Sequence, residues 1–373
     1  MKLTGLRRAP AQVDFVVVGR GLPSLVTALE LARRGASVSV VEDSASGERA
    51  PELGLMLLGP GRPYLTVANA IGRPAAQLLW AAGCENHLRL KAFLEQAARP
   101  CGYVARGSFL LARDRCHAED LAESEDMLRD DGFPGEFLDH YMIETRFDVT
   151  GFPGAYWAAE DAEIDPLELA SVVRQAAREA RVAFPTARAR ALRADAAGVV
   201  VSLEQGSLRG AAAVVATDGP AAGLLPELAP LLRPQALGRL SLSPLAGATL
   251  PGALRTADGR IAWQSSGASV LLAETGARPH GSDADLLLDF ASRLPLEAAS
   301  ARVQEDAGEV SLDGLPVVGR LPGRPLAVAC GFSRLSPGLA FAAARWVADA
   351  LLRGTDPTPD ALRPTRKPLA LGV

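Results

Sequence analysis

The residues best suited to chemistry are two glycines in a turn, followed at a distance by an acid. Gly19-Arg20-Gly21 comes directly after the apolar run 13–18, and Glu42 ends a second apolar run at 36–41. Glycines in such a turn let backbone N–H groups approach a diphosphate at a helix N-terminus, and a terminal carboxylate accepts hydrogen bonds from ribose hydroxyls. Glu42 also follows Ser24 at close to the spacing of about 20 residues typical of this motif. The stretch therefore predicts a dinucleotide-binding site.

The elements that must position these residues form a strand, a helix and a second strand. The run 13–18 predicts the first strand, 22–34 the helix, which Gly35 ends, and 36–41 the second strand. Pro23 falls in the first helical turn, where its missing N–H is not needed. Ser24 stands where the motif usually has its third glycine and is small enough for close packing of helix on strand. The alternative is a glycine turn in an ordinary α/β unit.

Composition places the chain among ordinary globular proteins. Its 373 residues are 48% hydrophobic and 22% charged, which is enough for two domains. A net charge of −4 argues against nucleic acid as a partner, because such a partner favours a basic face. No apolar run reaches the 18 or so residues of a membrane span, and the first residues lack the apolar core of a signal peptide. We therefore expect a cytoplasmic protein without a membrane span.

The four cysteines carry no signal for a metal site or a disulfide framework. They are scattered, without a CxxC pair or clustering with histidine. The sequence therefore predicts reduced thiols and no metal.

Later segments predict further strands and helices. Two apolar segments, 198–216 and 325–329, are expected to return to the nucleotide-binding sheet, the first as a hairpin that leads into a buried strand. Helices are expected at 65–82, 85–98, 118–131, 167–180 and 339–352, a strand at 107–112, and several strands within 241–272. The resulting layout is discontinuous along the chain.

Four blocks, in this order, resemble the D-amino acid oxidase/glycine oxidase superfamily of FAD-dependent amine oxidoreductases. The nearest likeness is to its sarcosine oxidase and gamma-glutamylputrescine oxidase branches. The blocks are the N-terminal unit, Ser46-Gly47-Glu48-Arg49-Ala50, Ala213-Val214-Val215-Ala216-Thr217-Asp218-Gly219, and Asp313-Gly314-Leu315-Pro316-Val317-Val318-Gly319 followed by Cys330-Gly331-Phe332-Ser333. The resemblance covers essentially the whole chain, and the DGLPVVG block is its most specific part.

The resemblance implies an α/β fold with FAD as the cofactor. A Rossmann-like FAD-binding domain would comprise residues 1–80, 160–228 and 307–373, and a discontinuous α+β substrate domain on an antiparallel sheet would comprise 81–159 and 229–306. The C-terminal loop and the start of the following helix would meet the flavin pyrimidine ring, where backbone N–H groups stabilise negative charge.

Motif and resemblance together nominate a set of cofactor-binding residues. They are Gly19, Gly21, Leu22, Pro23, Ser24, Glu42, Asp43, Ser46, Gly47, Arg49, Ala216, Thr217, Gly319, Gly331, Phe332, Ser333, Arg334 and Leu335.

The C-terminal loop departs from the family pattern. The family has Gly-x-Ser-Gly-His-Gly, whereas this chain has Gly331-Phe332-Ser333-Arg334-Leu335-Ser336, so two glycines and a histidine are replaced. One hypothesis is that the Arg334 guanidinium takes the place of backbone donors near flavin N1 and the C2 oxygen. The alternative is a solvated surface arginine.

The substrate side departs from the family as well. Family members place an arginine on a substrate-domain strand to bind the substrate carboxylate bidentately. In the corresponding segment, 260–267, Gln264 is the candidate for that position, which would favour a neutral amine or a larger peptide-like amine. Arg255 or Arg260 could substitute, although a surface charge is the favoured interpretation of each. Trp263 and the pair Tyr156-Trp157 are candidate walls of the substrate pocket, with core packing as the alternative.

The function expected from the resemblance is oxidation of a C–N bond of an amine or amino acid by hydride transfer to flavin N5. Trp263, Gln264 and Arg334 are the candidate catalytic residues. A second hypothesis is a family member without turnover that acts as a structural or regulatory subunit of a protein partner. A nicotinamide dehydrogenase is a third, and the DGLPVVG block argues against it.

Overall fold

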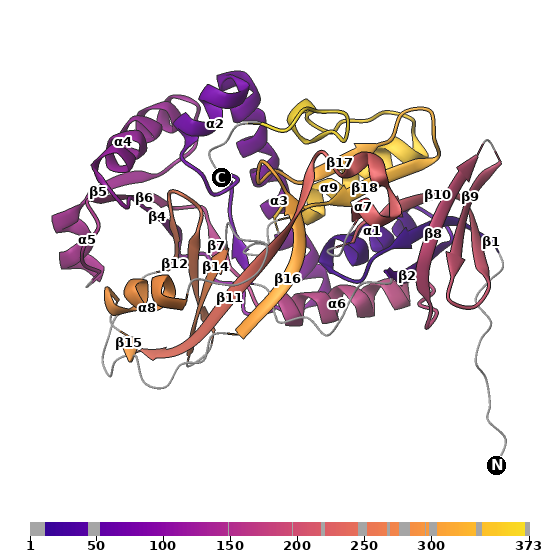
Figure 1. The fold of residues 1–373 in the computed structure, drawn as a ribbon, viewed down its shortest axis with the longest axis horizontal. Coiled ribbons are helices and arrows are strands. Elements are labelled where there is room, and N and C mark those ends of the chain that lie inside the picture. The colour runs from indigo at the N-terminus through magenta and orange to yellow at the C-terminus, as the bar shows by residue number, and fades with distance from the viewer. Residues whose placement is uncertain are drawn as a thin grey trace, which may run out of the picture.

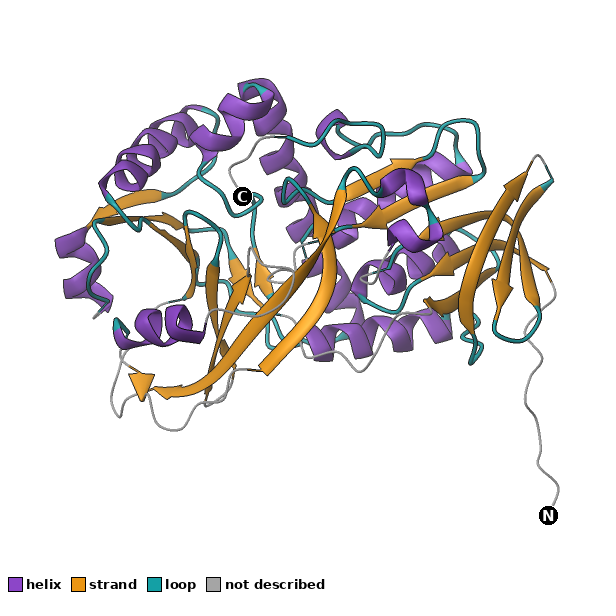
Figure 2. Cartoon of the chain, in the orientation of Figure 1, coloured by secondary structure: helices purple, strands orange, loops and turns teal. Residues whose placement is uncertain are grey.

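The computed structural model contains two large sheets, one on each side of the molecule in Figures 1 and 2. The structure describes residues 12–43, 53–147, 149–195, 197–217, 221–244, 252–266, 269–275, 284–294, 296–297, 304–332 and 338–369.

The first sheet is built around four parallel strands in the spatial order β2, β1, β10, β18. An antiparallel strand, β17, borders β18. The strand β9 pairs antiparallel with β10 and with β8, and β8 also pairs parallel with the end of β2. The strand bounds are β1 (Gln12–Val18), β2 (Val38–Asp43), β8 (Arg188–Asp195), β9 (Gly198–Leu203), β10 (Ser207–Val215), β17 (Val317–Arg320) and β18 (Leu326–Cys330). The expected strand–helix–strand unit and both returns to its sheet are confirmed, whereas β8 is a strand that the sequence analysis did not predict.

Both faces of this sheet are buried, as is typical of parallel strands. Along β1, Phe15 and Val17 belong to one apolar cluster and Val16 and Val18 to another on the opposite face. Helices α1 (Leu22–Arg33), α6 (Pro166–Glu179) and α9 (Ala340–Leu352) contribute to the first cluster, and α7 (Ala221–Leu224) and η1 (Pro226–Leu228) to the second. Apolar side chains on both faces therefore explain the nearly continuous hydrophobic runs in the sequence.

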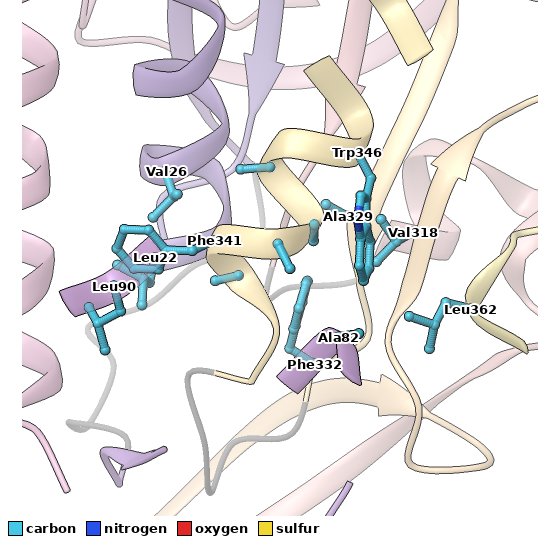
Figure 3. Close-up of a cluster of buried hydrophobic side chains, with 14 of the residues drawn as sticks. Leu22, Val26, Ala82, Leu90, Val318, Ala329, Phe332, Phe341, Trp346 and Leu362 are labelled. Atoms are coloured by element: carbon cyan, nitrogen blue, oxygen red, sulfur yellow. The ribbon is translucent and has the colours of Figure 1, made fainter. Parts of the chain in front are cut away.

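The first cluster joins helices that are far apart in sequence. Figure 3 shows Phe341 of α9 next to Leu22 of α1, with Leu90 of α3 (Arg73–Ala97) nearby. Phe332, which follows β18, lies in the same cluster beside Ala82. The segments that the sequence analysis linked to a cofactor therefore share one core.

The second sheet has the order β15-β11-β14-β13-β12-β4-β6-β5, and β16 also pairs with β11. Its pairings are antiparallel except for β4 and β12, which run parallel. The strand bounds are β4 (Ser108–Leu111), β5 (Glu136–Asp139), β6 (Gly154–Ala158), β11 (Leu232–Pro244), β12 (Ala253–Thr256), β13 (Ile261–Ser266), β14 (Ser269–Thr275), β15 (Leu296–Glu297) and β16 (Gln304–Ser311). The remaining elements are β3 (Leu55–Met56), which pairs with β7 (Ala162–Glu163), and α2 (Tyr64–Ile71), α4 (Arg115–Asp130), α5 (His140–Phe147), α8 (Ala284–Ser292) and η2 (Asp360–Leu362).

The helical region after β3 divides at a different place from the one expected. The sequence predicted helices at 65–82 and 85–98, but α2 ends at Gly72 and α3 then runs unbroken to Ala97. Gly72 has a positive φ of 86°, which favours glycine, and Pro74 stands in the first turn of α3. Gly83, near the expected break, lies inside α3, where a Cβ atom would overlap the backbone of Leu58. α3 therefore crosses the expected domain boundary at residues 80 and 81, and β16 crosses the one at 306 and 307.

No helix among the described residues is long and apolar enough to cross a membrane. The described part of the chain likewise holds no cluster of three or more histidine, cysteine or acidic side chains with the geometry of a metal site.

A side chain of α3 caps the first turn of α9. Asn86 is 1% exposed, and its Oδ1 accepts hydrogen bonds from the N–H groups of Phe341 at 2.9 Å and Ala342 at 3.2 Å. Its Nδ2 donates to the carbonyl oxygen of Gly338 at 3.0 Å. The resemblance implied that this helix start faces the flavin, but Asn86 already occupies these two N–H groups.

Replacing Asn86 with alanine should lower the free energy of unfolding by about 2–3 kcal/mol, because two buried N–H groups and one carbonyl lose their partners. Asn69→Ala is the matched control, since Asn69 is exposed on α2 and its loss should change the stability by less than about 0.5 kcal/mol. Urea titration of both variants measures the difference. Equal stabilities for Asn86→Ala and the wild type would contradict the capping role.

Candidate functional site

The carboxyl ends of the parallel strands meet around Gly19. This residue has φ +147°, and a Cβ atom there would overlap the carbonyl oxygen of Ala216, which follows β10. The N–H of Gly19 donates to Val41 at 2.9 Å, and the N–H of Ala216 donates to Val18 at 2.8 Å. These hydrogen bonds hold the carboxyl ends of β2, β1 and β10 side by side at one edge of the sheet. We call this place the carboxyl edge of the first sheet.

Helix α1 begins at this edge without a side-chain cap. Gly21 is the N-cap residue and its backbone is extended. Among the residues that the structure describes, no side chain accepts a hydrogen bond from the N–H groups of the first turn. Ser24 is fully buried and its hydroxyl donates to the carbonyl oxygen of Gly21 at 2.7 Å, so serine fits the place of the third glycine. Leu22 and Pro23 are also buried. An uncapped helix start beside glycine backbone suits an anionic diphosphate.

Glu42 lies at the end of β2, next to this helix start in the sheet. It is half-buried, and its carboxylate forms no hydrogen bond or ion pair with the described residues. Its oxygens can therefore accept hydrogen bonds from a ribose. The backbone of Asp43 ends the same strand, while its side chain lies outside the described part of the chain.

The predicted cofactor residues of other segments divide into three groups. A first group follows β10 and β18 at the carboxyl edge and is buried: Ala216, Thr217, Gly331 and Phe332. The carbonyl oxygen of Gly331 also accepts a hydrogen bond from the N–H of Ser311 at 3.2 Å. Gly319 lies within β17, opposite Val328, where a Cβ atom would come within 3.3 Å of Asp356 Oδ2. The structure thus gives Gly319 a packing role against the C-terminal segment. Ser46, Gly47, Arg49, Ser333, Arg334 and Leu335 lie outside the described residues.

The side chain of Gln264 is engaged by backbone. It is 5% exposed, its Oε1 accepts a 2.5 Å hydrogen bond from the N–H of Gly54, and its Nε2 donates to the carbonyl oxygen of Ile164 at 2.8 Å. The amide therefore joins β13 to the segments around β3 and β7. This arrangement corrects the interpretation of Gln264 as the counterpart of a substrate-binding arginine, because its polar atoms already have structural partners.

The aromatic candidates have different positions. Trp263 is fully buried in the apolar core that α8 covers, and its Nε1 donates to the carbonyl oxygen of Gly252 at 3.0 Å. Its ring packs in the core, which was the alternative interpretation. Tyr156 on β6 lines a cavity, whereas Trp157 on the same strand packs toward the core that contains Trp263.

Two cavities share Leu57, Leu58, Gly59 and Arg255. The aromatic cavity is lined by β4 and β6 of the second sheet and by helices α2, α3 and α4, whereas the inner cavity borders Phe332 at the carboxyl edge. The walls of the aromatic cavity include Tyr64, Trp80, Phe133 and Tyr156. The walls of the inner cavity include Leu315, Pro316, Phe332 and Leu339.

Arg255 stands where the two cavities meet. It belongs to β12 opposite Ala262 and is 6% exposed, so the interpretation as a surface charge is wrong. Burial and the nearby Arg62 guanidinium lower the pKa of Arg255 to about 10, which leaves it charged at neutral pH. The strand consists of four consecutive buried residues, Ala253–Thr256. A segment this short has no polar–apolar alternation from which the sequence could predict that its arginine is buried.

Asp161 is the charged group that faces Arg255 across this region. It is 4% exposed and accepts hydrogen bonds from the N–H of Leu58 at 2.8 Å and the hydroxyl of Ser108 at 2.6 Å. Burial raises its pKa to about 6, although these two hydrogen bonds and Arg255 act in the opposite direction. The sequence analysis missed this residue, since a lone aspartate in a turn carries no recognisable signal.

Comparison with known proteins identifies the family and the fold. The model of the DAO family, described as FAD dependent oxidoreductase, matches residues 14–350. A search of curated protein sequences found no significant match.

Solved structures share the fold over nearly their full length. Glycine oxidase from Geobacillus kaustophilus superimposes with a TM-score of 0.77 at 20% identity, covering 96% of this chain and 99% of that chain. L-proline dehydrogenase from P. horikoshii gives a TM-score of 0.74 at 16% identity, covering 96% and 98%. Iminodiacetate oxidase from Chelativorans sp. BNC1 gives 0.74 at 19% identity, covering 94% and 99%. The superfamily that the sequence motifs resemble is thereby confirmed: the chain belongs to the DAO family of FAD-dependent oxidoreductases, and FAD is its cofactor.

Proposed function

We propose that the protein oxidises a C–N bond of an amine or amino acid at the inner cavity, beside FAD bound along the carboxyl edge. When bound, FAD supplies the acceptor for a hydride at flavin N5. The observation that carries the proposal is the uncapped start of α1 beside Gly19, together with the carboxylate of Glu42, which has no hydrogen-bond or ion-pair partner among the described residues. These groups fit the diphosphate and one ribose of FAD.

The remaining cofactor contacts in this proposal follow from the position of each segment. The N–H groups after Gly21 would hold the diphosphate, and Glu42 would hold the adenosine ribose. Gly331 and Phe332 border the flavin end, because Phe332 also lines the inner cavity. We keep Asp43, Ser46, Gly47, Arg49, Ser333, Arg334 and Leu335 as proposed neighbours of FAD, with Arg334 beside flavin N1 and the C2 oxygen.

The domain division belongs to the same proposal. A Rossmann-like FAD-binding domain would contain the first sheet, and a substrate domain would contain the second. Because α3 crosses residues 80 and 81 and β16 crosses 306 and 307, we propose that both elements link the two domains and belong wholly to neither.

The protein's own residues would orient the substrate and exclude water. Aromatic and aliphatic side chains of the two cavities remove solvent from the reacting amine, which strengthens electrostatic contacts within the site. Asp161, Arg255 and Arg62 are charged groups on these walls, so the substrate's charged groups would be oriented by them.

Anaerobic mixing of the FAD-bound protein with a panel of amines and amino acids tests the reaction. We expect one class of substrate to bleach the visible absorbance of the oxidised flavin. A yellow protein that no member of the panel reduces would contradict the proposal and would favour the alternative, a subunit without turnover.

Glu42→Gln should weaken FAD binding by about tenfold, because an uncharged amide accepts hydrogen bonds from the ribose less strongly than a carboxylate does. Titration of the protein with FAD, followed by quenching of flavin fluorescence, measures the change. Glu204→Gln is the matched control, since Glu204 pairs with Arg190 on the surface of β8 and β9. An FAD affinity of Glu42→Gln equal to that of the control would contradict the assignment.

The buried Asp161 should make stability depend on pH. Its pKa is about 6 in the folded protein and 3.8 as an ordinary side chain, so the folded state binds more protons between these values. Its stabilising contribution is complete below pH 4 and is lost as the pH rises through 6, by roughly 3 kcal/mol at most.

Unfolding free energies measured from pH 4 to 8 should therefore fall more steeply for the wild type than for Asp161→Asn, whose amide does not ionise. Asp360→Asn is the control, because Asp360 is 91% exposed and should leave the wild-type slope unchanged. Parallel curves for the wild type and Asp161→Asn would show that Asp161 does not titrate in this range.

A further inference from the structure

The aromatic cavity presents a hydroxyl group to which the described residues supply no partner. Four hydroxyl-bearing side chains line this cavity: Tyr64, Ser108, Ser124 and Tyr156. The two serines donate to acceptors of the protein at 2.6 Å, a carboxylate for Ser108 and a backbone carbonyl for Ser124. Tyr64 donates to the carboxylate of Asp131. Tyr156, in contrast, forms no hydrogen bond with any residue that the structure describes.

The position of Tyr156 is fixed by the second sheet and by a glycine. Tyr156 lies on β6 between Leu110 of β4 and Phe137 of β5, and it is 7% exposed. A Cβ atom at Gly135 would come within 1.9 Å of the Tyr156 hydroxyl oxygen, so glycine at that position leaves room for the hydroxyl. The hydroxyl group is therefore held at a defined point of the cavity wall.

The surroundings of Tyr156 keep its hydroxyl protonated. Burial raises the pKa of Tyr156, and the carboxylates of Asp161 and Glu125 act in the same direction. At neutral pH the group is therefore an uncharged hydroxyl, which can donate one hydrogen bond and accept others. A buried polar group without a partner is unfavourable, so a ligand that supplies the partner is bound more tightly.

The other walls of the aromatic cavity indicate that the ligand is aromatic. The rings of Tyr64 and Trp80 pack edge to face, with their centroids 4.7 Å apart. Phe133 adds a further ring to the same cavity. Aromatic side chains bury a large area and pack well against another ring. A flat aromatic group therefore suits this cavity.

Charges of both signs in the same cavity favour an uncharged group next to Tyr156. A carboxylate at that point would meet the carboxylates of Asp161 and Glu125, which already act on the Tyr156 hydroxyl. An ammonium group would meet the guanidinium groups of Arg62 and Arg255 on the cavity wall. A neutral hydrogen-bonding group avoids both repulsions.

We propose that the aromatic cavity holds the side chain of the substrate, and that Tyr156 selects an aromatic side chain with an uncharged polar substituent such as a hydroxyl group. The Tyr156 hydroxyl forms a hydrogen bond with this substituent, and Trp80 and Phe133 contact the aromatic ring. The contact concerns the side chain of the substrate and not its amine or its carboxylate. It rests on the proposed function, which places the reacting C–N bond in the adjoining inner cavity.

The test compares 4-hydroxyphenylacetate with 4-methylphenylacetate, two probes of nearly equal shape. Calorimetric titration of the FAD-bound protein should show that the hydroxyl probe binds about tenfold more tightly than the methyl probe. Tyr156→Phe should weaken binding of the hydroxyl probe by about tenfold and leave binding of the methyl probe unchanged. Tyr141→Phe is the matched control, because Tyr141 is 67% exposed on α5 and its loss should leave the preference as in the wild type.

Thermal unfolding separates this binding role from a structural one. The Tyr156 hydroxyl has no partner among the described residues, so Tyr156→Phe should keep the thermal midpoint of the wild type. Tyr64→Phe loses the hydrogen bond to Asp131 and should lower the midpoint. A midpoint of Tyr156→Phe as low as that of Tyr64→Phe, measured without any probe, would assign Tyr156 a structural role and overturn the proposal.

Several binding results would also overturn it: equal affinities for the two probes, binding of neither probe, or an unchanged preference in Tyr156→Phe. Tighter binding of 4-carboxyphenylacetate or 4-(aminomethyl)phenylacetate than of the hydroxyl probe would do the same, since these carry a charged substituent. None of these measurements requires turnover. A protein that selects the hydroxyl probe through Tyr156 but oxidises no amine would contradict the proposed function alone, whereas amine oxidation without a role of Tyr156 in probe binding would contradict this inference alone.

Discussion

The close approach of Gly19 to the carbonyl of Ala216 is the contact on which the rest of the site depends. A side chain at residue 19 would separate the ends of β1 and β10, and with them the start of α1 from the segments that follow β10 and β18. Two backbone hydrogen bonds, from Gly19 to Val41 and from Ala216 to Val18, keep the carboxyl ends of β2, β1 and β10 side by side. The uncapped helix start, the Glu42 carboxylate and Phe332 are all positioned from this edge.

Two buried arginines show how differently the fold treats the same side chain. The side chain of Arg366 is 5% exposed and donates to both oxygens of Asp313, at 2.9 and 3.0 Å, and to the carbonyl oxygen of Leu315 at 2.7 Å. It thereby ties the C-terminal segment to the loop that lines the inner cavity. The side chain of Arg255 is buried as well, and among the described residues it has no such partners. A satisfied arginine stabilises the fold, whereas an unsatisfied one at a cavity is suited to binding.

The sequence predicted the parts of the fold that local pattern controls. Residues 13–41 contain an apolar run, a glycine turn, a helical stretch and a second apolar run, which together predict one strand–helix–strand unit. The strands β10 and β18, which pair in the same sheet, are continuous apolar runs in the sequence, as expected of buried strands. The predicted boundary between the two helices was wrong, because the sequence alone does not distinguish Gly72, where α2 ends, from Gly83, which lies inside α3. Only the positive φ of Gly72 and the packing of Gly83 on Leu58 distinguish them. The strand β8, with its charged residues, resembles a surface loop in sequence.

The candidate site was predictable where it depends on the backbone and not where it depends on tertiary contacts. Gly19, Gly21 and Glu42 follow from a motif whose spacing reflects one strand–helix–strand unit. Arg255 and Gln264 do not, because their roles are set by segments far away in sequence: Gly61 against the arginine, and Gly54 and Ile164 around the amide.

The most direct test of the account is FAD retention by Gly19→Ala, compared with Gly206→Ala. Both glycines have positive φ, but only residue 19 meets a backbone oxygen, while the space around residue 206 is open. After reconstitution and gel filtration, Gly19→Ala should retain much less FAD than the wild type, with about tenfold weaker affinity or more, while Gly206→Ala retains the wild-type amount. A folded Gly19→Ala protein that holds FAD as tightly as Gly206→Ala would contradict the central claim.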